Sequence, residues 1–374
     1  MTKNAIISSA AAHPSPRLAS ITQARQALLQ TGQKLQTGRI SPWVERSWQR
    51  CLALGLKPRM SVAFDQISAA RARSTQEANQ HLASTARPLL ENLARAIVNT
   101  RYFAILTNAE GVVVDACGAI DRSDTRATQI TRVGTDLCEH SIGTTAIGTA
   151  LSELQPVWVH RGEHFFEATS VYSCAGAPLF GPDGACIGIL DVTGVDVQER
   201  RELKHLVRQS ACKIENAMVL AQKHSILLRL NWPGNPIGHE ADGLVCLDED
   251  GWIKGANRVA RQMVSDLTSA TRADVHINEV FGLPIEQLFD ASKRPDHLLE
   301  LPLWSGLRLQ AQAIAHTDEA NALPATSGTV PLRDVEAAMI RKAVDDTGGN
   351  ISQAARMLGI GRATLYRKLG QRAH

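Results

Sequence analysis

The sequence predicts an α+β protein with a helical N-terminal segment, a mixed α/β domain, a small third segment and an all-α C-terminal domain. Three patterns support this prediction. Helical spacing of apolar residues dominates positions 20–100, short β-type runs occupy 101–195, and two short helices joined by a glycine turn are indicated near the C-terminus. At 374 residues, the chain exceeds one ordinary domain and suggests two or three.

The composition is that of a globular protein, with 44% hydrophobic residues and a formal net charge of +3. Any affinity for nucleic acid must therefore come from a local basic patch. No apolar stretch approaches the ~20 residues that span a bilayer, and the N-terminus lacks a signal-peptide pattern. Seven scattered cysteines without a C-x-x-C pair fit reduced thiols, so we expect a cytoplasmic protein without membrane contact or cofactor.

The spacing of Cys138 and His140, two residues apart, is one that could suggest a metal or haem ligand pair. Metal ligands usually come in close pairs, and no second pair accompanies this one. The sequence therefore predicts no metal site.

The N-terminal segment is predicted to be helical. Ser41-Pro42 is a helix start with proline at the first position, and Gly55 ends that helix. The run from Ile67 to Thr100 has few helix breakers and helical apolar spacing, which predicts a further long helical stretch.

The middle domain is predicted to alternate strands with turns such as Asn108–Gly111. A helix is expected within 134–151 and a closing helical stretch over 198–229. The expected strands are 102–107, 112–115, 156–160, 170–179 and 185–192.

The chain after this domain changes character twice. The Pro- and Gly-rich residues 231–236 predict one linker, and the small polar residues of 317–330 predict a second. Between them we expect a hairpin over 243–254, a helix over 257–267 and a strand near 301–313. The expected boundaries are a helical module at 20–100, a mixed domain at 101–230, a third segment at 237–316, a linker at 317–330 and a C-terminal domain at 331–374.

The C-terminal domain has the pattern of a helix-turn-helix. Gly348-Gly349 ends a first helix, Asn350 is a suitable N-cap for a second, and a turn at 359–361 leads into a third over 363–369. Residues 351–374 contain five Lys or Arg and no Asp or Glu. This acid-free third helix favours contact with DNA over the alternative, a plain three-helix bundle with a solvated basic face.

The segment GGNISQAARMLGIGRATLYRKL resembles the Fis-type helix-turn-helix of bacterial enhancer-binding regulators. The resemblance implies that a homodimer binds double-stranded DNA at two half-sites. It assigns phosphate positioning to Ser352 and Gln353. The residues expected to contact DNA beside them are Arg362, Thr364, Tyr366, Arg367 and Lys368.

The middle of the chain resembles the GAF domain of acetoin-catabolism regulators, through TDLCEHSIGTTAIGTAL (135–151), GEHF (162–165) and CAGAPLFGPDGACIGILDVTG (174–194). SWQRCLALGLKP (47–58) is also similar to that family, so the resemblance spans most of 35–230. A GAF domain implies a small-molecule pocket between a sheet and its helices. The residues expected to line it are Glu139, His140, Thr144, Thr145, His164, Phe166, Tyr172, Cys174 and Asp191.

Several of these residues have a structural alternative. Thr144 and Thr145 fit helix caps, Cys174 fits a core residue, and His164 fits a surface residue. A nucleophilic Cys174 paired with a histidine would need a third, orienting group, and the sequence shows none. A GAF-type methionine-sulfoxide reductase would need an organised cysteine pair, which the spacing does not offer. The sequence thus favours a binding module over an enzyme.

Residues 240–313 resemble a PAS domain in having a strand, a turn and a second strand before an asparagine that opens a helix; a structural connector is the alternative. Regulators of the resembled type usually carry an ATPase domain, whose phosphate-binding loop needs G-x-x-x-x-G-K-[ST]. The chain contains no Gly-Lys dipeptide and no GAFTGA loop. We therefore expect regulation without ATP hydrolysis, through DNA occupancy or direct contact with RNA polymerase.

Together, these patterns predict a homodimeric transcription regulator that responds to a small-molecule effector. The alternative is a truncated regulator that acts by heterodimerising with a full-length relative, and the basic third helix argues against it. Replacement of Arg362 and Arg367 distinguishes the two, because only the first function requires contact with DNA.

Overall fold

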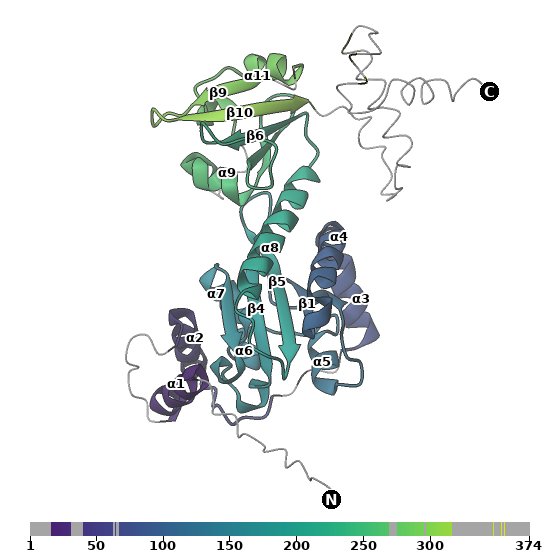
Figure 1. Ribbon diagram of the computed structural model, residues 1–374, viewed down its shortest axis with the longest axis vertical. Coiled ribbons are helices and arrows are strands. Elements are labelled where there is room, and N and C mark those ends of the chain that lie inside the picture. Colours follow the sequence, from purple (N-terminus) through teal and green to yellow (C-terminus); the bar gives the residue numbers. More distant parts are fainter. Residues whose placement is uncertain are drawn as a thin grey trace, which may run out of the picture. The chain divides into compact units, whose positions relative to one another are not determined.

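The computed structural model describes residues 16–30, 40–62, 64, 67–268, 275–294 and 297–315, with Thr347, Gln353 and Ala355 as single positions. The chain divides into two units, residues 1–316 and 317–374, and every helix and strand with described bounds belongs to the first (Figure 1). The predicted helix-turn-helix and the linker before it lie outside the described residues, apart from the three single positions.

A five-stranded antiparallel sheet, in the order β2-β1-β5-β4-β3, forms the centre of the first part of the chain. All five strands were predicted, and their ends lie within three residues of the expected ones. The near-continuous apolar composition of β1 fits burial of the sheet on both faces. The strands are β1 (Tyr102–Asn108), β2 (Val113–Gly118), β3 (Val157–His160), β4 (Tyr172–Phe180) and β5 (Cys186–Val195).

Helices lie on both faces of this sheet (Figure 1). On one face, α4 (Gln80–Ile97) and α8 (Leu203–Leu220) pack against Leu106 and its neighbours. Successive residues of a strand point to opposite faces, so Ile105 belongs to the second core. The helices of that second face are α2 (Pro42–Ala53), α5 (Thr125–Ile130), α6 (Glu139–Ile142) and α7 (Ala146–Glu153).

The remaining N-terminal helices are α1 (Pro16–Arg25), a π-helical turn at Gln26–Gln30, and α3 (Ala69–Ala78). The helical prediction for the N-terminal segment is confirmed for its described residues. As expected, α2 begins at Pro42 directly after Ser41, and the chain turns at Gly55, whose φ of 78° suits glycine. The long stretch predicted from Ile67 is interrupted at Asn79, which separates α3 from α4.

The predicted helix over 198–229 is wrong beyond Leu220. Residues Ile226–Asn231 instead form strand β6, which pairs with strands on both sides. The Pro- and Gly-rich residues 232–236, expected to be an interdomain linker, join β6 to the next strand of the same sheet. Burial of Leu228 and Leu230 in that sheet accounts for the apolar run that the helix prediction misread.

This second antiparallel sheet has the order β8-β7-β6-β10-β9. The strand expected near 301–313 is a hairpin of two strands that turns at Gly306, with φ 86°. Besides β6, the second sheet consists of β7 (Gly243–Leu247), β8 (Ile253–Ala256), β9 (Leu298–Pro302) and β10 (Arg308–Ala315).

Helices of the second sheet pack with its main core on one face, and Val219 from the last turn of α8 packs with Leu227, Leu244 and Cys246. Asn257 caps α9, as its place at the start of a predicted helix suggested.

No helix within the described part of the chain is long and apolar enough to cross a bilayer. The helices that accompany the second sheet are α9 (Arg258–Met263), a 3-10 turn at Ser265–Thr268, α10 (Ile277–Val280) and α11 (Ile285–Ser292).

Candidate functional site

A small cavity lies between the first sheet and the helices α5, α6 and α7. It offers about 30 Å³ to the centres of water-sized molecules, more than the ~10–15 Å³ that one water needs. Five of the predicted residues line it: Thr145, His164, Tyr172, Cys174 and Asp191. The other lining residues are Phe64, Ile105, Ile130, Leu137, Ile142, Ala146, Ile147, Thr169 and Thr193.

Within the described part of the chain, Asp191 is the lining residue whose side chain lacks a hydrogen-bond partner at one oxygen. It lies fully buried on the central strand β5, where Thr193 Oγ1 donates a hydrogen bond to its Oδ2. Its Oδ1 is buried and has no hydrogen-bond partner among the described residues. Burial raises the pKa of Asp191 to about 7. Buried polar atoms are nearly always paired, so this unpaired oxygen is the unusual feature of the cavity lining.

His164 and Cys174 form the second polar part of the lining. The Nδ1 of His164 lies 3.0 Å from the carbonyl oxygen of Arg161, which can only accept, so Nδ1 carries the proton. Burial lowers the pKa of His164 to about 4, and burial raises the pKa of Cys174 well above its usual value. The Cys174 thiol therefore donates to the unprotonated Nε2 of His164 at 3.5 Å, and both groups are uncharged near neutral pH.

The hydroxyl groups of the lining already have partners. Tyr172 donates to the carbonyl of Arg126 at 3.1 Å. Thr145 donates to the carbonyl of Leu137 and also caps α7, which is the structural alternative given for it, although it lies at the cavity. Thr169 donates to the carbonyl of Phe166. Asp191 Oδ1 is thus the polar position left for a ligand among these side chains.

Four predicted residues lie away from the cavity lining. Glu139 accepts from Ser47 Oγ at 2.6 Å and pairs with Arg50, while Thr144 contacts Ser47, so both face α2. His140 is exposed, with 71% of its side chain accessible. Phe166 is a core residue that packs edge-on against Phe165.

Sequence reasoning missed Thr169, Thr193 and the apolar lining residues. Thr193 could have been found, because it stands two residues from Asp191 on one strand and therefore on the same face. The apolar lining residues, such as Ile105 and Ile142, are indistinguishable in sequence from ordinary core residues.

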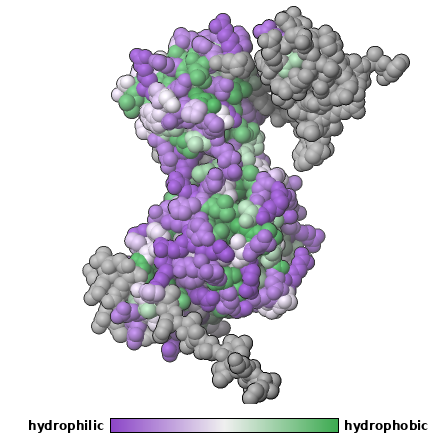
Figure 2. Space-filling model, viewed as in Figure 1, coloured by the Kyte–Doolittle hydropathy of each residue, from purple (hydrophilic) through white to green (hydrophobic). Residues whose placement is uncertain are grey.

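Helix α1 holds the loop that carries His164. Arg25 donates to the backbone carbonyls of Gly162 and Phe165 at 2.8 and 2.9 Å and also to that of His164. Arg17 pairs with Glu163 at 2.7 Å; burial raises the pKa of this glutamate to about 7. In the face drawn in Figure 2, the outer surface around the first sheet and its helices is largely hydrophilic, in contrast to the apolar cavity lining.

Comparison with known proteins decides the family. Residues 18–216, more than half of the chain, match the family described as MimR, N-terminal domain. The chain belongs to this family. Residues 331–371 match the family described as bacterial regulatory protein, Fis family, which confirms the predicted helix-turn-helix type.

Individual relatives are transcriptional regulators. The acetoin catabolism regulatory protein of Cupriavidus necator is 33% identical over 256 residues, which are 66% of this chain and 37% of that protein. The propane 2-monooxygenase operon transcriptional activator MimR of Mycolicibacterium goodii is 29% identical over 199 residues, 52% of this chain and 33% of its own length. The chain thus matches about a third of the length of these curated relatives.

Among solved structures, the chain is similar to one in the E. coli DhaR(N)–DhaL complex, with 15% identity and a TM-score of 0.45. That match covers 74% of this chain and all of the other. The named functions of the curated relatives agree with the expectation of a regulator rather than an enzyme.

Proposed function

We propose that this protein is a sequence-specific, DNA-binding transcription regulator whose cavity binds a small, uncharged, oxygen-containing metabolite. It acts as a homodimer without ATP hydrolysis, by occupying DNA or by contacting RNA polymerase. The main support for ligand binding is the buried Oδ1 of Asp191, which has no described hydrogen-bond partner and lines the same cavity as the uncharged side chains of His164 and Cys174.

The chemistry of the lining favours an alcohol or a carbonyl compound. An anionic ligand would lose its hydration in an apolar cavity that no Lys or Arg of the described residues lines, which is strongly unfavourable. A hydroxyl or ketone oxygen can instead exchange a hydrogen bond with Asp191 and leave its carbon atoms against Ile105, Ile130 and Ile142. The cavity volume limits the ligand to a few heavy atoms unless the lining moves. Acetoin, which the name of the Cupriavidus necator relative contains, is a small hydroxyketone of this class.

DNA binding is supported by the Fis-family match and by the acid-free basic segment 351–374. The absence of a Gly-Lys dipeptide supports a mechanism that does not use a phosphate-binding loop for ATP. The residues proposed to contact DNA are Ser352, Gln353, Arg362, Thr364, Tyr366, Arg367 and Lys368.

Calorimetric titration of the full chain with acetoin, and with acetate as a charged comparison, tests the ligand proposal. We expect binding of acetoin and not of acetate. Asp191→Ala should weaken acetoin binding by about tenfold, the value of one lost hydrogen bond. Asp290→Ala, which removes an exposed aspartate of α11, is the matched control and should bind as the native protein does. Equal affinity of the Asp191→Ala protein, or equal binding of acetate, would contradict the proposal.

Footprinting on DNA upstream of the protein's own gene tests the second part. Protection should weaken as salt rises, because phosphate contacts release counterions. Arg362→Ala with Arg367→Ala should abolish protection while sedimentation still shows a dimer. If the native protein gave no footprint under any salt or ligand condition, DNA binding would be overturned. Dimerisation without a footprint would then favour the truncated-regulator alternative.

A further inference from the structure

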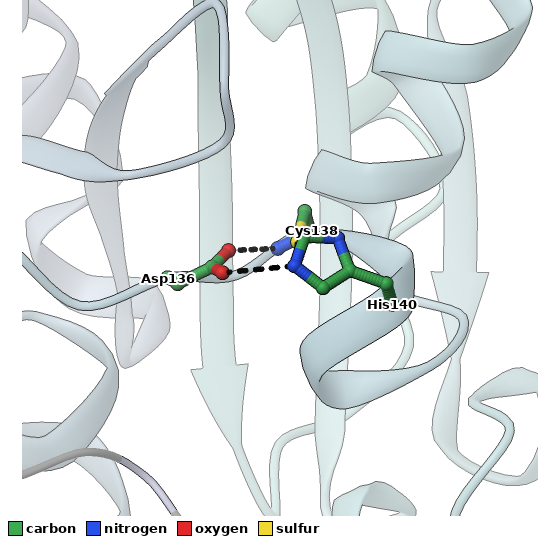
Figure 3. Close-up of side chains that lie close together, drawn as sticks. All are labelled: Asp136, Cys138 and His140. Carbon is green, nitrogen blue, oxygen red and sulfur yellow. Dashed lines mark hydrogen bonds and ion pairs between the residues drawn. The ribbon is translucent and has the colours of Figure 1, made fainter. Parts of the chain in front are cut away.

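Three potential metal ligands meet at the entry to α6, outside the cavity described above (Figure 3). The Nε2 of His140 lies 3.4 Å from Cys138 Sγ and 3.5 Å from a carboxylate oxygen of Asp136, so one ring nitrogen faces both other ligands. One ligand atom from each residue lies within 4.8 Å of the others. The sequence had suggested only the Cys138–His140 pair; the fold adds a third donor.

The backbone explains why side chains at alternate positions converge. Residue Asp136 forms an isolated bridge with Val112, and Leu137 donates to the carbonyl of Gly111, so this segment is fixed against the β1–β2 turn. Cys138 is extended, with φ −77° and ψ 167°, and the first turn of α6 then brings His140 back beside it. The ligand spacing therefore follows from a strand-like segment that bends into a helix.

The Asp136 carboxylate is also held from outside the cluster. Its Oδ1 accepts from the backbone N–H of Cys138 at 3.0 Å, and its Oδ2 accepts from Ser141 Oγ at 2.6 Å. Outer hydrogen bonds of this kind orient metal-ligating carboxylates and strengthen metal binding. Cys138 is buried while His140 is exposed, so an ion has a path from solvent to the sulfur.

We propose that Asp136, Cys138 and His140 bind one zinc-class divalent ion. A set of one sulfur, one nitrogen and one oxygen ligand suits Zn²⁺ and its probe Co²⁺, whereas Mg²⁺ and Ca²⁺ require oxygen ligands. Three protein ligands leave a fourth tetrahedral position for water. The ion would hold the segment that contributes Leu137 and Ile142 to the cavity wall, so metal binding and the shape of the cavity are linked through that segment.

Titration of the full chain with Co²⁺ under reducing conditions tests this proposal without any ligand or DNA. We expect one Co²⁺ per chain, a sulfur-to-cobalt charge-transfer band in the near ultraviolet, and displacement by Zn²⁺. Cys138→Ser should remove the band, and His140→Ala and Asp136→Asn should each weaken binding by at least about tenfold. Ser141→Ala should weaken it by about 10- to 100-fold, the range for outer-sphere partners.

Two matched variants guard against nonspecific effects. Cys117→Ser removes a partly exposed thiol outside the cluster, and His205→Ala removes another exposed imidazole, so both should leave the cobalt spectrum unchanged. Circular dichroism checks that each variant is folded. Absence of the charge-transfer band in the native protein, or its persistence in Cys138→Ser, would overturn the metal site. Calorimetry of acetoin without added metal tests the ligand proposal separately.

Discussion

The guanidinium of Arg50 forms two hydrogen bonds with the carboxylate of Glu139, at 2.7 and 2.8 Å, and so ties α2 to α6. Glu139 was expected to face a ligand, but its carboxylate is satisfied by α2, because Ser47 Oγ donates to it as well. This pair fixes α2 on the same face of the sheet as the cavity. Arg50 is the cationic partner of this buried carboxylate, whose other hydrogen bonds come from uncharged hydroxyl groups.

Replacement of Arg50 by alanine should destabilise the protein by about 2–3 kcal/mol, measured as the free energy of urea unfolding. Loss of one partner of a fully buried pair costs ~3–5 kcal/mol, and a third of the Arg50 side chain remains exposed, which reduces the effect. Arg87→Ala is the control: its pairs with Glu91 and Asp115 are more exposed, so about 1 kcal/mol or less is expected. Similar losses in both variants would show that the Arg50 pair is no more than a surface contact.

The pH dependence of stability should reveal Asp191. Its pKa is raised to about 7 in the fold, against ~3.9 in the unfolded chain, so between pH 4 and 7 the folded state binds more protons. The contribution of Asp191 to the free energy of unfolding therefore falls as pH rises through this range. The Asp191→Asn variant should lack this pH dependence. The difference in free energy of unfolding between the variant and the native protein should therefore change by at least about 1.4 kcal/mol from pH 4 to 8, the equivalent of one pKa unit. A constant difference across this range would refute the raised pKa.

His164 should give the opposite slope. Its pKa is lowered to about 4 in the fold, against ~6.5 in the unfolded chain, so the unfolded state binds more protons between pH 4 and 6.5. Stability from this residue is present above pH 6.5 and is lost as pH falls towards 4. His164→Gln should remove that loss, measured in the same urea series, while exposed His205→Gln should track the native protein.

Helix α1 should detach when Arg25 is replaced by alanine. The guanidinium donates to three backbone carbonyls of the loop that carries His164, and hydrogen bonds to charged groups contribute about 1.5–3 kcal/mol each. Hydrogen exchange of the α1 amides should speed up about tenfold or more, with the strands of the first sheet unaffected. Arg73→Ala, on the exposed face of α3, should leave the exchange of α1 as it is. Unchanged exchange after Arg25→Ala would mean that other contacts dock the helix.

The strands of the first sheet were predictable because turn residues separate short runs of β-type composition. The strand formed by Ile226–Asn231 was not predictable, because a short apolar-rich run directly after a helix fits either a continued helix or a strand. Its neighbours β7 and β10 decide the matter, and β10 lies some eighty residues further along the chain. Helices α5 and α10, with six and four residues, are too short to show a helical period.

The cavity lining was partly predictable for a similar reason. His164, Cys174 and Asp191 stood out as ionisable residues within a segment of apolar and small residues. Glu139 stood out in the same way, but its partner Arg50 lies about ninety residues earlier in the chain. Which buried polar residue meets a protein partner and which faces a cavity is decided by tertiary packing, which a single sequence does not display.

Helix α8 serves both sheets, because Ile214 belongs to a core of the first sheet while Val219, one and a half turns later, packs with the second. Unfolding either sheet would therefore leave part of one continuous helix bare of its apolar contacts. The two sheets should melt in a single cooperative transition. A chain cut just after Leu220 would expose Val219 to water, so dissection of the protein at that point should give a fragment prone to self-association.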